Sequence, residues 1–419
     1  MSHTELRPDT APVTAPRHRL LIPRLSGLML LQYLVFGTWY ATVGLVLVQH
    51  DLGSITGALY SLAALAAVIS PMFLGAVADR FLPTQHVLAG LQLLGGLLLL
   101  AVPTAINAQH SGLVLSLVFV YMLLFQPTVA LSQSVTFAHL KNRSDVFPYI
   151  RVFGTVGWIV AGVLIGQLGL SASASLFYVT AAASILLALY CVTLPSTPPP
   201  QRGVKFQLGD VVGTQAFTLF RHRKFAVFAG CALLTYIPIA MYNSFGATYL
   251  SALGIPDVAT VLTIGQVSEL IFIPTIPWVL KKFGMKWVLF VGMLSWGVRF
   301  LLFVIATGGG ADWAIGAVAL HGICNDFFIV ICFMYVERIA GPAIKAQAQA
   351  LLLLITQGVG VMVGSFVGGL IYNRSVGTAG AEAPLTSWNT FFTVPIVVSI
   401  AMAAIFAIFF RVESACSRV

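Results

Sequence analysis

The chain has 419 residues, of which 58% are hydrophobic and only 8% are charged, and its mean hydropathy is +0.95. About a quarter of the residues of a soluble domain are charged, so the composition excludes a soluble protein and predicts an all-α integral membrane protein. The net charge of +9 does not indicate a nucleic-acid partner, because the basic residues follow membrane topology, as shown below. The cysteines have no metal-ligand spacing, and we expect neither a metal site nor a disulfide framework.

Apolar runs that are long enough to cross a bilayer follow one another along almost the whole chain. Residues 1–24 are polar and proline-rich, and we expect a cytoplasmic tail without a cleavable signal peptide. The sequence predicts a six-helix bundle at 25–195, a cytoplasmic linker at 196–224, a second six-helix bundle at 225–411 and a tail at 412–419. The twelve runs lie at about 25–49, 54–78, 85–106, 111–138, 147–168, 173–195, 225–250, 257–280, 286–307, 312–336, 344–372 and 388–410.

Lysine and arginine residues predict the orientation of these runs, because cytoplasmic loops carry an excess of them. If the N-terminus is cytoplasmic, nearly all bases outside the runs fall on that side, and the opposite loops hold only Arg374. Both termini are therefore predicted to be cytoplasmic. Prolines also recur at matching places in the two halves, such as Pro71 and Pro274, which favours two repeated bundles around a site that alternates between the two faces of the membrane.

Two carboxylates lie near the middle of predicted spans, Glu269 in the eighth and Asp326 in the tenth. An ionised group there costs roughly 3 kcal/mol, so it is expected to face a partner, water or a substrate. Gln266 precedes Glu269 by three residues and shares its helical face. Glu269 could bind substrate and carry a proton, or form a buried ion pair between helices. Asp326 could load and release a proton, because apolar surroundings favour the neutral acid, or it could be locked to Arg299.

The remaining polar groups within the spans include two arginines. Arg299 in the ninth run fits a supporting, conformational role, whereas Arg151 in the fifth could be a cytoplasmic gate or could reach a substrate. His321 could belong to a site or bond to a backbone carbonyl. Amides bind hydroxyls and ring edges while aromatic rings stack on flat faces, so the set suits a neutral, polyhydroxylated ligand with a flat ring. Each amide alone is more often an interhelical hydrogen bond. The uncharged members include Gln32, Tyr33, Trp39, Gln126, Ser132, Thr155, Trp158, Asn243, Gln266 and Gln357.

The loop between the second and third runs, GAVADR at residues 75–80, resembles the signature loop of the major facilitator superfamily. There Gly75 would permit close helix contact, and Asp79 would pair with bases or a helix N-terminus and hold one conformation. Asp79 and Arg80 are therefore candidate gating residues. The sequence has no Walker loop, nucleophile elbow, HExxH or dinucleotide fingerprint, and its loops are too short for a soluble catalytic domain. We expect no enzymatic activity.

Longer stretches resemble the bacterial nucleoside:proton symporters of that superfamily. They include FPYIRVFGTVGW at 147–158, GQVSELIFIPTIP at 265–277 and NDFF at 325–328, and the matches run from the first span to the eleventh. The resemblance implies proton-coupled uptake of nucleosides by a monomer in the inner-membrane lipid bilayer, with the proton as coupling ion and no other cofactor. It implies proton coupling through Glu269 and Asp326. The implied substrate residues are Arg151, Thr155, Asn243, Gln266 and Glu269.

The chain departs from the family pattern within the implied site. Trp158 stands where a phenylalanine is familiar and enlarges the stacking surface. Ala240 replaces a glutamine and removes one hydrogen-bonding arm. His321 and Asn325 stand where aromatic residues are familiar, and Asn325 and Phe327 are included in the predicted substrate site. These departures leave an alternative, a proton-coupled transporter of a sugar or another small polar solute on the same fold. A non-transporting receptor or scaffold is disfavoured, because it needs no charges at mid-membrane.

Overall fold

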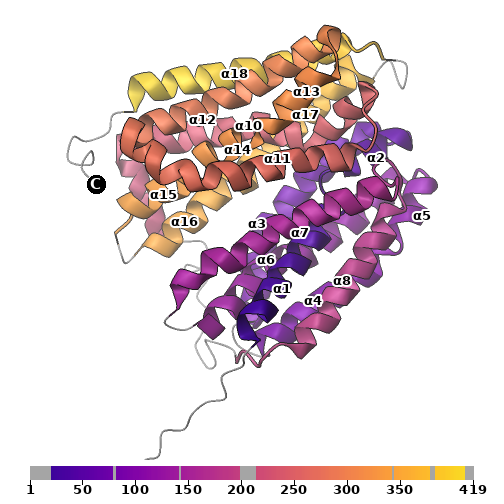
Figure 1. Ribbon diagram of the computed structural model, residues 1–419, viewed down its shortest axis with the longest axis vertical. Helices are drawn as coiled ribbons and strands as arrows, with labels where there is room; N and C mark the ends of the chain where they lie inside the picture. The colour runs from indigo at the N-terminus through magenta and orange to yellow at the C-terminus, as the bar shows by residue number, and fades with distance from the viewer. Residues whose placement is uncertain are drawn as a thin grey trace, which may run out of the picture.

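The computed structural model describes residues 20–78, 82–140, 143–198, 214–341, 344–377 and 383–410, and the regular elements in these ranges are all helices (Figure 1). Asp79 and Arg80 lie outside the described residues, as do most of the predicted linker and tails. Within the described ranges, nine helices are long and apolar enough to cross a membrane, or ten if one bent pair counts as a single span. The all-helical, multi-pass architecture predicted from composition is confirmed at this level.

The first half of the chain contains four longer helices and two pairs of shorter ones. The first predicted run is broken at residues 38–42 into α1 and α2, and α1 alone has only 17 residues. The 3₁₀ turns Gly53–Ile55 and Ser144–Val146 precede α3 and α7. The helices are α1 (Leu21–Gly37), α2 (Val43–Gln49), α3 (Thr56–Ala78), α4 (Thr84–Leu99), α5 (Val102–Asn107), α6 (Ser111–Leu140), α7 (Phe147–Gln167) and α8 (Leu176–Thr193).

The second half is more irregular, with π-helical turns at Asp326–Val330 and Leu354–Gly360 and 3₁₀ turns at Thr214–Arg221 and Ile273–Thr275. Its helices are α10 (Arg223–Ala252), α11 (Val258–Phe272), α12 (Ile276–Gly309), α13 (Ala311–Ala319), α14 (His321–Asn325), α15 (Ile331–Ile339), α16 (Lys345–Leu353), α17 (Val361–Ser375) and α18 (Ser387–Phe409). A straight α12 would extend about 50 Å, well beyond the hydrocarbon core of a bilayer. Gly284 divides it with φ 74°, a conformation that glycine adopts readily, and so separates the eighth and ninth predicted runs.

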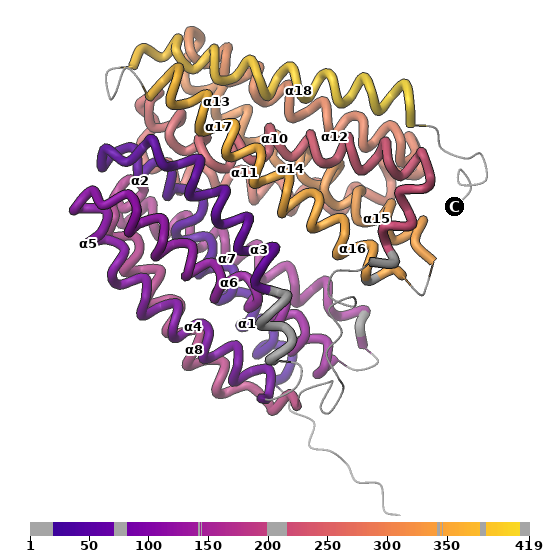
Figure 2. Tube along the Cα trace, turned by 180° about the vertical axis from the view of Figure 1, so that it is seen from behind, coloured from indigo at the N-terminus to yellow at the C-terminus, as the bar shows by residue number. Residues whose placement is uncertain are grey.

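Each half of the chain has its own hydrophobic core. One core is built almost entirely from α1 to α8, and the other almost entirely from residues after 214. The two groups of helices, indigo to magenta and rose to yellow, lie side by side and diverge toward one end (Figures 1 and 2). This division places any group that lies between α7 and α11 at the boundary of the two halves.

Contacts between the two groups lie toward one end of the helices. We call it the closed end, formed by α2, the beginnings of α3 and α11, the final turns of α7 and α10, and α17. There Ser61 Oγ donates to the Met362 carbonyl at 2.9 Å. Gly57 and Gly369 approach so closely that a Cβ on either would overlap the other backbone. Small residues permit such close helix packing in membranes.

Candidate functional site

Glu269 lies on α11 and is held by two nitrogen atoms of the α14 segment. Its Oε1 accepts a hydrogen bond from Asn325 Nδ2 at 2.5 Å and lies 3.2 Å from His321 Nε2. The Glu269 side chain is 15% exposed, so it is held in place without being sealed into the core. In the described part of the chain no lysine or arginine contacts it directly, so it does not form the simple ion pair considered from the sequence.

His321 connects Glu269 to a buried arginine. Arg299, which is 0% exposed on α12, donates from Nη1 to His321 Nδ1 at 3.0 Å. A guanidinium can only donate, so Nδ1 accepts, and a neutral imidazole then carries its hydrogen on Nε2, the nitrogen that lies 3.2 Å from Glu269 Oε1. Two donors converge on Glu269 Oε1, which explains why Asn325 Nδ2 lies 2.9 Å from His321 Nε2. We call this arrangement the Arg299–His321–Glu269 row.

Aromatic rings surround the arginine end of the row. The Arg299 guanidinium carbon lies 4.3 Å from the centre of the Tyr242 ring and 4.6 Å from that of Trp296, within the range of cation–π attraction. Arg299 Nε and Nη2 have no hydrogen-bond partner among the described residues. Arg299 therefore contacts His321 and the two rings, and it does not form the lock with Asp326 that the sequence left open. His321 likewise bonds to side chains and not to a backbone carbonyl.

Asp326 is more deeply buried than Glu269. It begins the π-helical turn that ends at Val330, is 2% exposed, and its Oδ2 has no hydrogen-bond partner in the described ranges. π-helices are rare in proteins, and the single π-helical turns that do occur are often found at functional sites. A buried charged oxygen without a donor raises the free energy of the fold, so the position suits a group that changes its protonation state.

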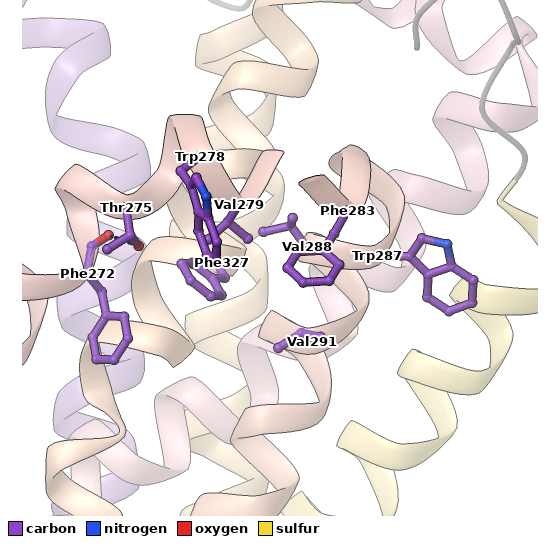
Figure 3. Close-up of a pocket in the computed structure, with 9 residues that line it drawn as sticks. All are labelled: Phe272, Thr275, Trp278, Val279, Phe283, Trp287, Val288, Val291 and Phe327. Atoms are coloured by element: carbon purple, nitrogen blue, oxygen red, sulfur yellow. Dashed lines mark hydrogen bonds between the residues drawn. The ribbon is translucent and has the colours of Figure 1, made fainter. Parts of the chain in front are cut away.

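An apolar hollow of about 360 Å³ lies at the junction of α11, α12 and the π-helical turn (Figure 3). Phe327 lines it below the indole of Trp278 and packs at 6.1 Å from Phe272, while neither Glu269 nor Asp326 lines it. The structure thus places Phe327 with the apolar hollow and not with the polar cluster. The lining residues are Phe272, Thr275, Trp278, Val279, Phe283, Trp287, Val288, Val291 and Phe327.

The other half of the chain contributes three partly exposed side chains from α7. Arg151, Thr155 and Trp158 follow one another at helical spacing and share a face. The Arg151 guanidinium stacks 4.1 Å above the Tyr33 ring and is close enough to Glu269 to attract its charge. Thr155 has no hydrogen-bond partner among the residues that the structure describes. Arg151 therefore places one end of this polar and aromatic face of α7 near Glu269, on the helix α11 that packs against α7.

Two rings that the sequence did not single out, one on α1 and one in the break that follows it, support Trp158. Phe36 meets Trp158 edge to face at 5.1 Å, and Tyr40 lies 6.5 Å away. Their spacing of four residues within the first predicted run was the available signal. Trp39 and Gln32 were among the polar and aromatic candidates in the sequence. They are 0% and 1% exposed and face the core of the first half.

The remaining predicted residues on α10 and α11 have different environments. Asn243 is partly exposed and has no hydrogen-bond partner in the described part of the chain, so it is free to bind a ligand. Gln266 Nε2 lies 3.4 Å from His321 Nε2, beside the row. Ala240 is 0% exposed and packs against Gly364 of α17, so the substitution at this position does not open space toward a ligand.

Known proteins match nearly the whole chain. A family model described as "Nucleoside H+ symporter" matches residues 21–415. The nucleoside permease NupG of Escherichia coli K12 is 30% identical over 408 residues, covering 93% of this chain and 95% of the permease. The xanthosine permease of the same strain is 31% identical over 367 residues, covering 83% and 87%. A crystal structure of the nucleoside transporter NupG matches with a TM-score of 0.82 at 28% identity, covering 92% of this chain and 99% of that one. The chain therefore belongs to the nucleoside H+ symporter family, and it is a membrane transporter and not an enzyme.

Proposed function

We propose that this protein takes up nucleosides together with protons across the bacterial inner membrane, as a monomer that works by alternating access. The family is defined by nucleoside and proton symport, and two relatives are named for nucleoside and xanthosine transport. The observation that carries the proposal is the partly exposed Glu269 carboxylate, held by neutral donors across from the α7 face of the other half. The proton is the coupling ion, and no other cofactor is required.

The proposed architecture has twelve spans in two six-helix bundles, at 25–195 and 225–411, with both termini in the cytoplasm. It counts α1 with α2 as one span, α13 to α15 as another, and divides α12 at Gly284. The two separate hydrophobic cores support two bundles. The linker joins α8 to α10, and α10 runs from the linker toward the closed end. The closed end is then extracytoplasmic, and the conformation described here is open toward the cytoplasm.

Substrate contacts are proposed from both bundles. Arg151 and Thr155 on α7 and Asn243 on α10 would bind the polar edges of the nucleoside, because their polar groups are partly exposed and lack hydrogen-bond partners among the described residues. Trp158 would stack on the base. Gln266, Glu269 and Asn325 would bind from the second bundle, while Phe327 would shape the site only from the apolar hollow behind it.

Glu269 and Asp326 are proposed to carry the coupling. An ionised Glu269 accepts from Asn325, whereas the protonated acid can itself donate, so proton binding changes which polar groups it can hold. Asp326 supplies a second protonatable group one residue beyond Asn325. Arg299 serves the conformational change through its contact with His321, and Asp79 and Arg80 serve it as a gate in the loop after α3.

Reconstitution into vesicles tests this proposal. Vesicles with an imposed inward proton gradient should accumulate radiolabelled uridine or adenosine, and a protonophore should abolish the accumulation. Glu269→Gln should reduce the internal concentration to that outside while exchange of labelled for unlabelled nucleoside persists. Glu337→Gln is the matched control, because Glu337 forms an exposed pair with Lys345 at 2.6 Å.

Three results would count against the proposal. Accumulation that survives the protonophore contradicts proton coupling, and wild-type accumulation by Glu269→Gln removes that side chain from the mechanism. Accumulation of glucose with no accumulation of either nucleoside would replace the proposed substrate by the sugar alternative.

A further inference from the structure

The segment that begins at His321 is fitted closely against α11. A Cβ at Gly265 would lie 2.9 Å from His321 Cβ, so only a glycine lets the imidazole approach α11 this closely. The Gly322 N–H donates to Ser268 Oγ at 2.7 Å, which satisfies a backbone donor in the first turn of α14, just after its break from α13. His321 is 7% exposed. These contacts fix the position of the imidazole between α11 and α12.

The hydrogen-bond partners of His321 also fix its hydrogen. Arg299 Nη1 donates to Nδ1, so a hydrogen on Nδ1 would face another donor at 3.0 Å. At Nε2 a carboxylate acceptor is available, because Glu269 Oε1 lies 3.2 Å away, although the amide nitrogens of Asn325 and Gln266 also lie at 2.9 and 3.4 Å. This arrangement favours a neutral imidazole with its hydrogen on Nε2. Glu269 is the only carboxylate that contacts the ring in the described part of the chain. The groups that face the ring are Tyr242, Gln266, Glu269, Trp296, Arg299 and Asn325.

We infer that His321 is a positioning residue that transmits the charge of Arg299 to Glu269 and does not itself carry the coupled proton. The inference rests on the proposed role of Glu269 as a proton carrier. With Glu269 ionised, the row holds one positive and one negative charge; with Glu269 protonated, the positive charge of Arg299 is unbalanced. The row therefore favours release of the proton from Glu269 to water in the cytoplasm-facing conformation, while His321 keeps its single hydrogen.

Two substitutions separate positioning from proton carriage. In His321→Gln, the amide oxygen can accept from Arg299 and the amide nitrogen can donate to Glu269, but the group cannot take up a proton. His321→Phe keeps a flat ring and removes both nitrogens, and with them the contacts to Arg299 and Glu269. We expect His321→Gln to retain proton-driven accumulation within about threefold of wild type. We expect His321→Phe to reduce accumulation by about tenfold or more, because the loss of a hydrogen bond to a charged group has an effect of this size.

The accumulation measured in each of the two variants can contradict the inference. If His321→Gln loses accumulation as completely as His321→Phe while exchange persists in both, His321 carries the proton and the inference is wrong. If His321→Phe accumulates uridine or adenosine like wild type, the ring has no positioning role. Glu269→Gln is measured beside them, because normal accumulation in that variant would show failure of the proposed function itself.

A spectroscopic measurement needs no nucleoside and no transport. Nitrogen NMR of the wild-type protein labelled with ¹⁵N-histidine should give one protonated and one unprotonated nitrogen for His321 from about pH 5 to pH 8, the range in which an ordinary histidine changes charge. The signals are assigned by their absence from His321→Gln. Arg299→Met should release the ring and let it take up a second proton in that range. A doubly protonated His321 near pH 6 in the wild-type protein would overturn the inference.

Discussion

The two halves of the molecule each bury a polar network, and the networks differ in charge and in saturation. In the first half Gln32, Gln92, Thr128 and Ser184 are at most 1% exposed. Gln92 Nε2 donates to Thr128 Oγ1 at 2.9 Å, Gln32 Nε2 donates to the same oxygen at 2.8 Å, and Ser184 Oγ donates to Gln92 Oε1 at 2.6 Å. The network is neutral, and it joins α1, α4, α6 and α8 into one bundle.

The second half buries charges and leaves some of their atoms without partners. Arg299 Nε and Nη2 and Asp326 Oδ2 lack hydrogen bonds among the described residues, and Glu269 is partly exposed. Saturated buried networks stabilise one packing, whereas unsatisfied buried groups raise its free energy and call for a separate explanation. We interpret the first network as structural, and the buried charged groups of the second half as the groups that take part in transport.

The largest expected effect is that of Arg299→Met on coupled transport. Methionine can fill the space between Tyr242 and Trp296, but it cannot donate to His321. We expect proton-driven accumulation to fall by about 10- to 100-fold, because hydrogen bonds to charged groups contribute about 1.5–3 kcal/mol. The thermal unfolding midpoint should change little, because the charge that is removed is buried with Nε and Nη2 unpaired, so the cost of its burial is removed with it. Normal accumulation in this variant would remove the functional contrast between the halves.

Gln92→Leu should show the opposite pattern. It removes the donor from Gln92 to Thr128 and the acceptor for Ser184 Oγ, so that only Gln32 still bonds to the Thr128 side chain, and we expect the free energy of unfolding to fall by about 2 kcal/mol. Uptake per folded molecule should stay near wild type. The control is Ser116→Ala, which removes an exposed hydroxyl bonded at 2.8 Å to its own helix. A stable Gln92→Leu protein with lost coupling would reverse our interpretation of the first network.

The sequence predicted the family, the membrane-spanning helical class and the transporter function, and the comparisons confirm all three. It could also place Gln266 and Glu269 on one face, because residues three apart on a regular helix point in similar directions. It could not tell that Gln32 faces its own bundle, because the direction in which a helix faces depends on its neighbours. Gln32 and Gln266 look alike in the sequence, but only Gln266 lies beside the row.

The Arg299–His321–Glu269 row could not be predicted from the sequence. Arg299 and His321 are 22 residues apart and are joined through two helix breaks, at Gly310 and at Leu320. Opposite charge made Asp326 one possible partner of Arg299 in the sequence, and nothing in the sequence indicated a histidine as the partner instead. The π-helical turn that begins at Asp326 also has no sequence signal that distinguishes it from an ordinary helical turn.

A smaller effect is expected at the closed end, where the halves touch without polar networks. A methyl group in Gly369→Ala would lie 2.8 Å from the Gly57 Cα, so one helix must shift. Overpacking that raises the free energy of the closed conformation by about 1 kcal/mol should increase the ratio of open to closed molecules at this end roughly fivefold. A cysteine at position 61, labelled with an impermeant maleimide from outside, would report the change. Gly230→Ala is the control, because nothing lies within 4 Å of its Cβ; equal labelling in the two variants would contradict the assigned closed end.

The smallest effect concerns the aromatic face of Trp158, which we propose that the first half offers to the base beside the polar groups of Arg151 and Thr155. Trp158→Phe keeps an aromatic face, so half-saturation for the transported nucleoside should rise only about threefold, within the energy of one aromatic contact. Trp158→Ala should raise it about tenfold or more, because stacking of a base on an aromatic side chain contributes about 1–3 kcal/mol. Trp278→Phe alters a tryptophan of the apolar hollow and should leave half-saturation unchanged. An alanine variant with wild-type affinity would mean that the base stacks elsewhere, and the second half would then hold the ligand as well as the proton.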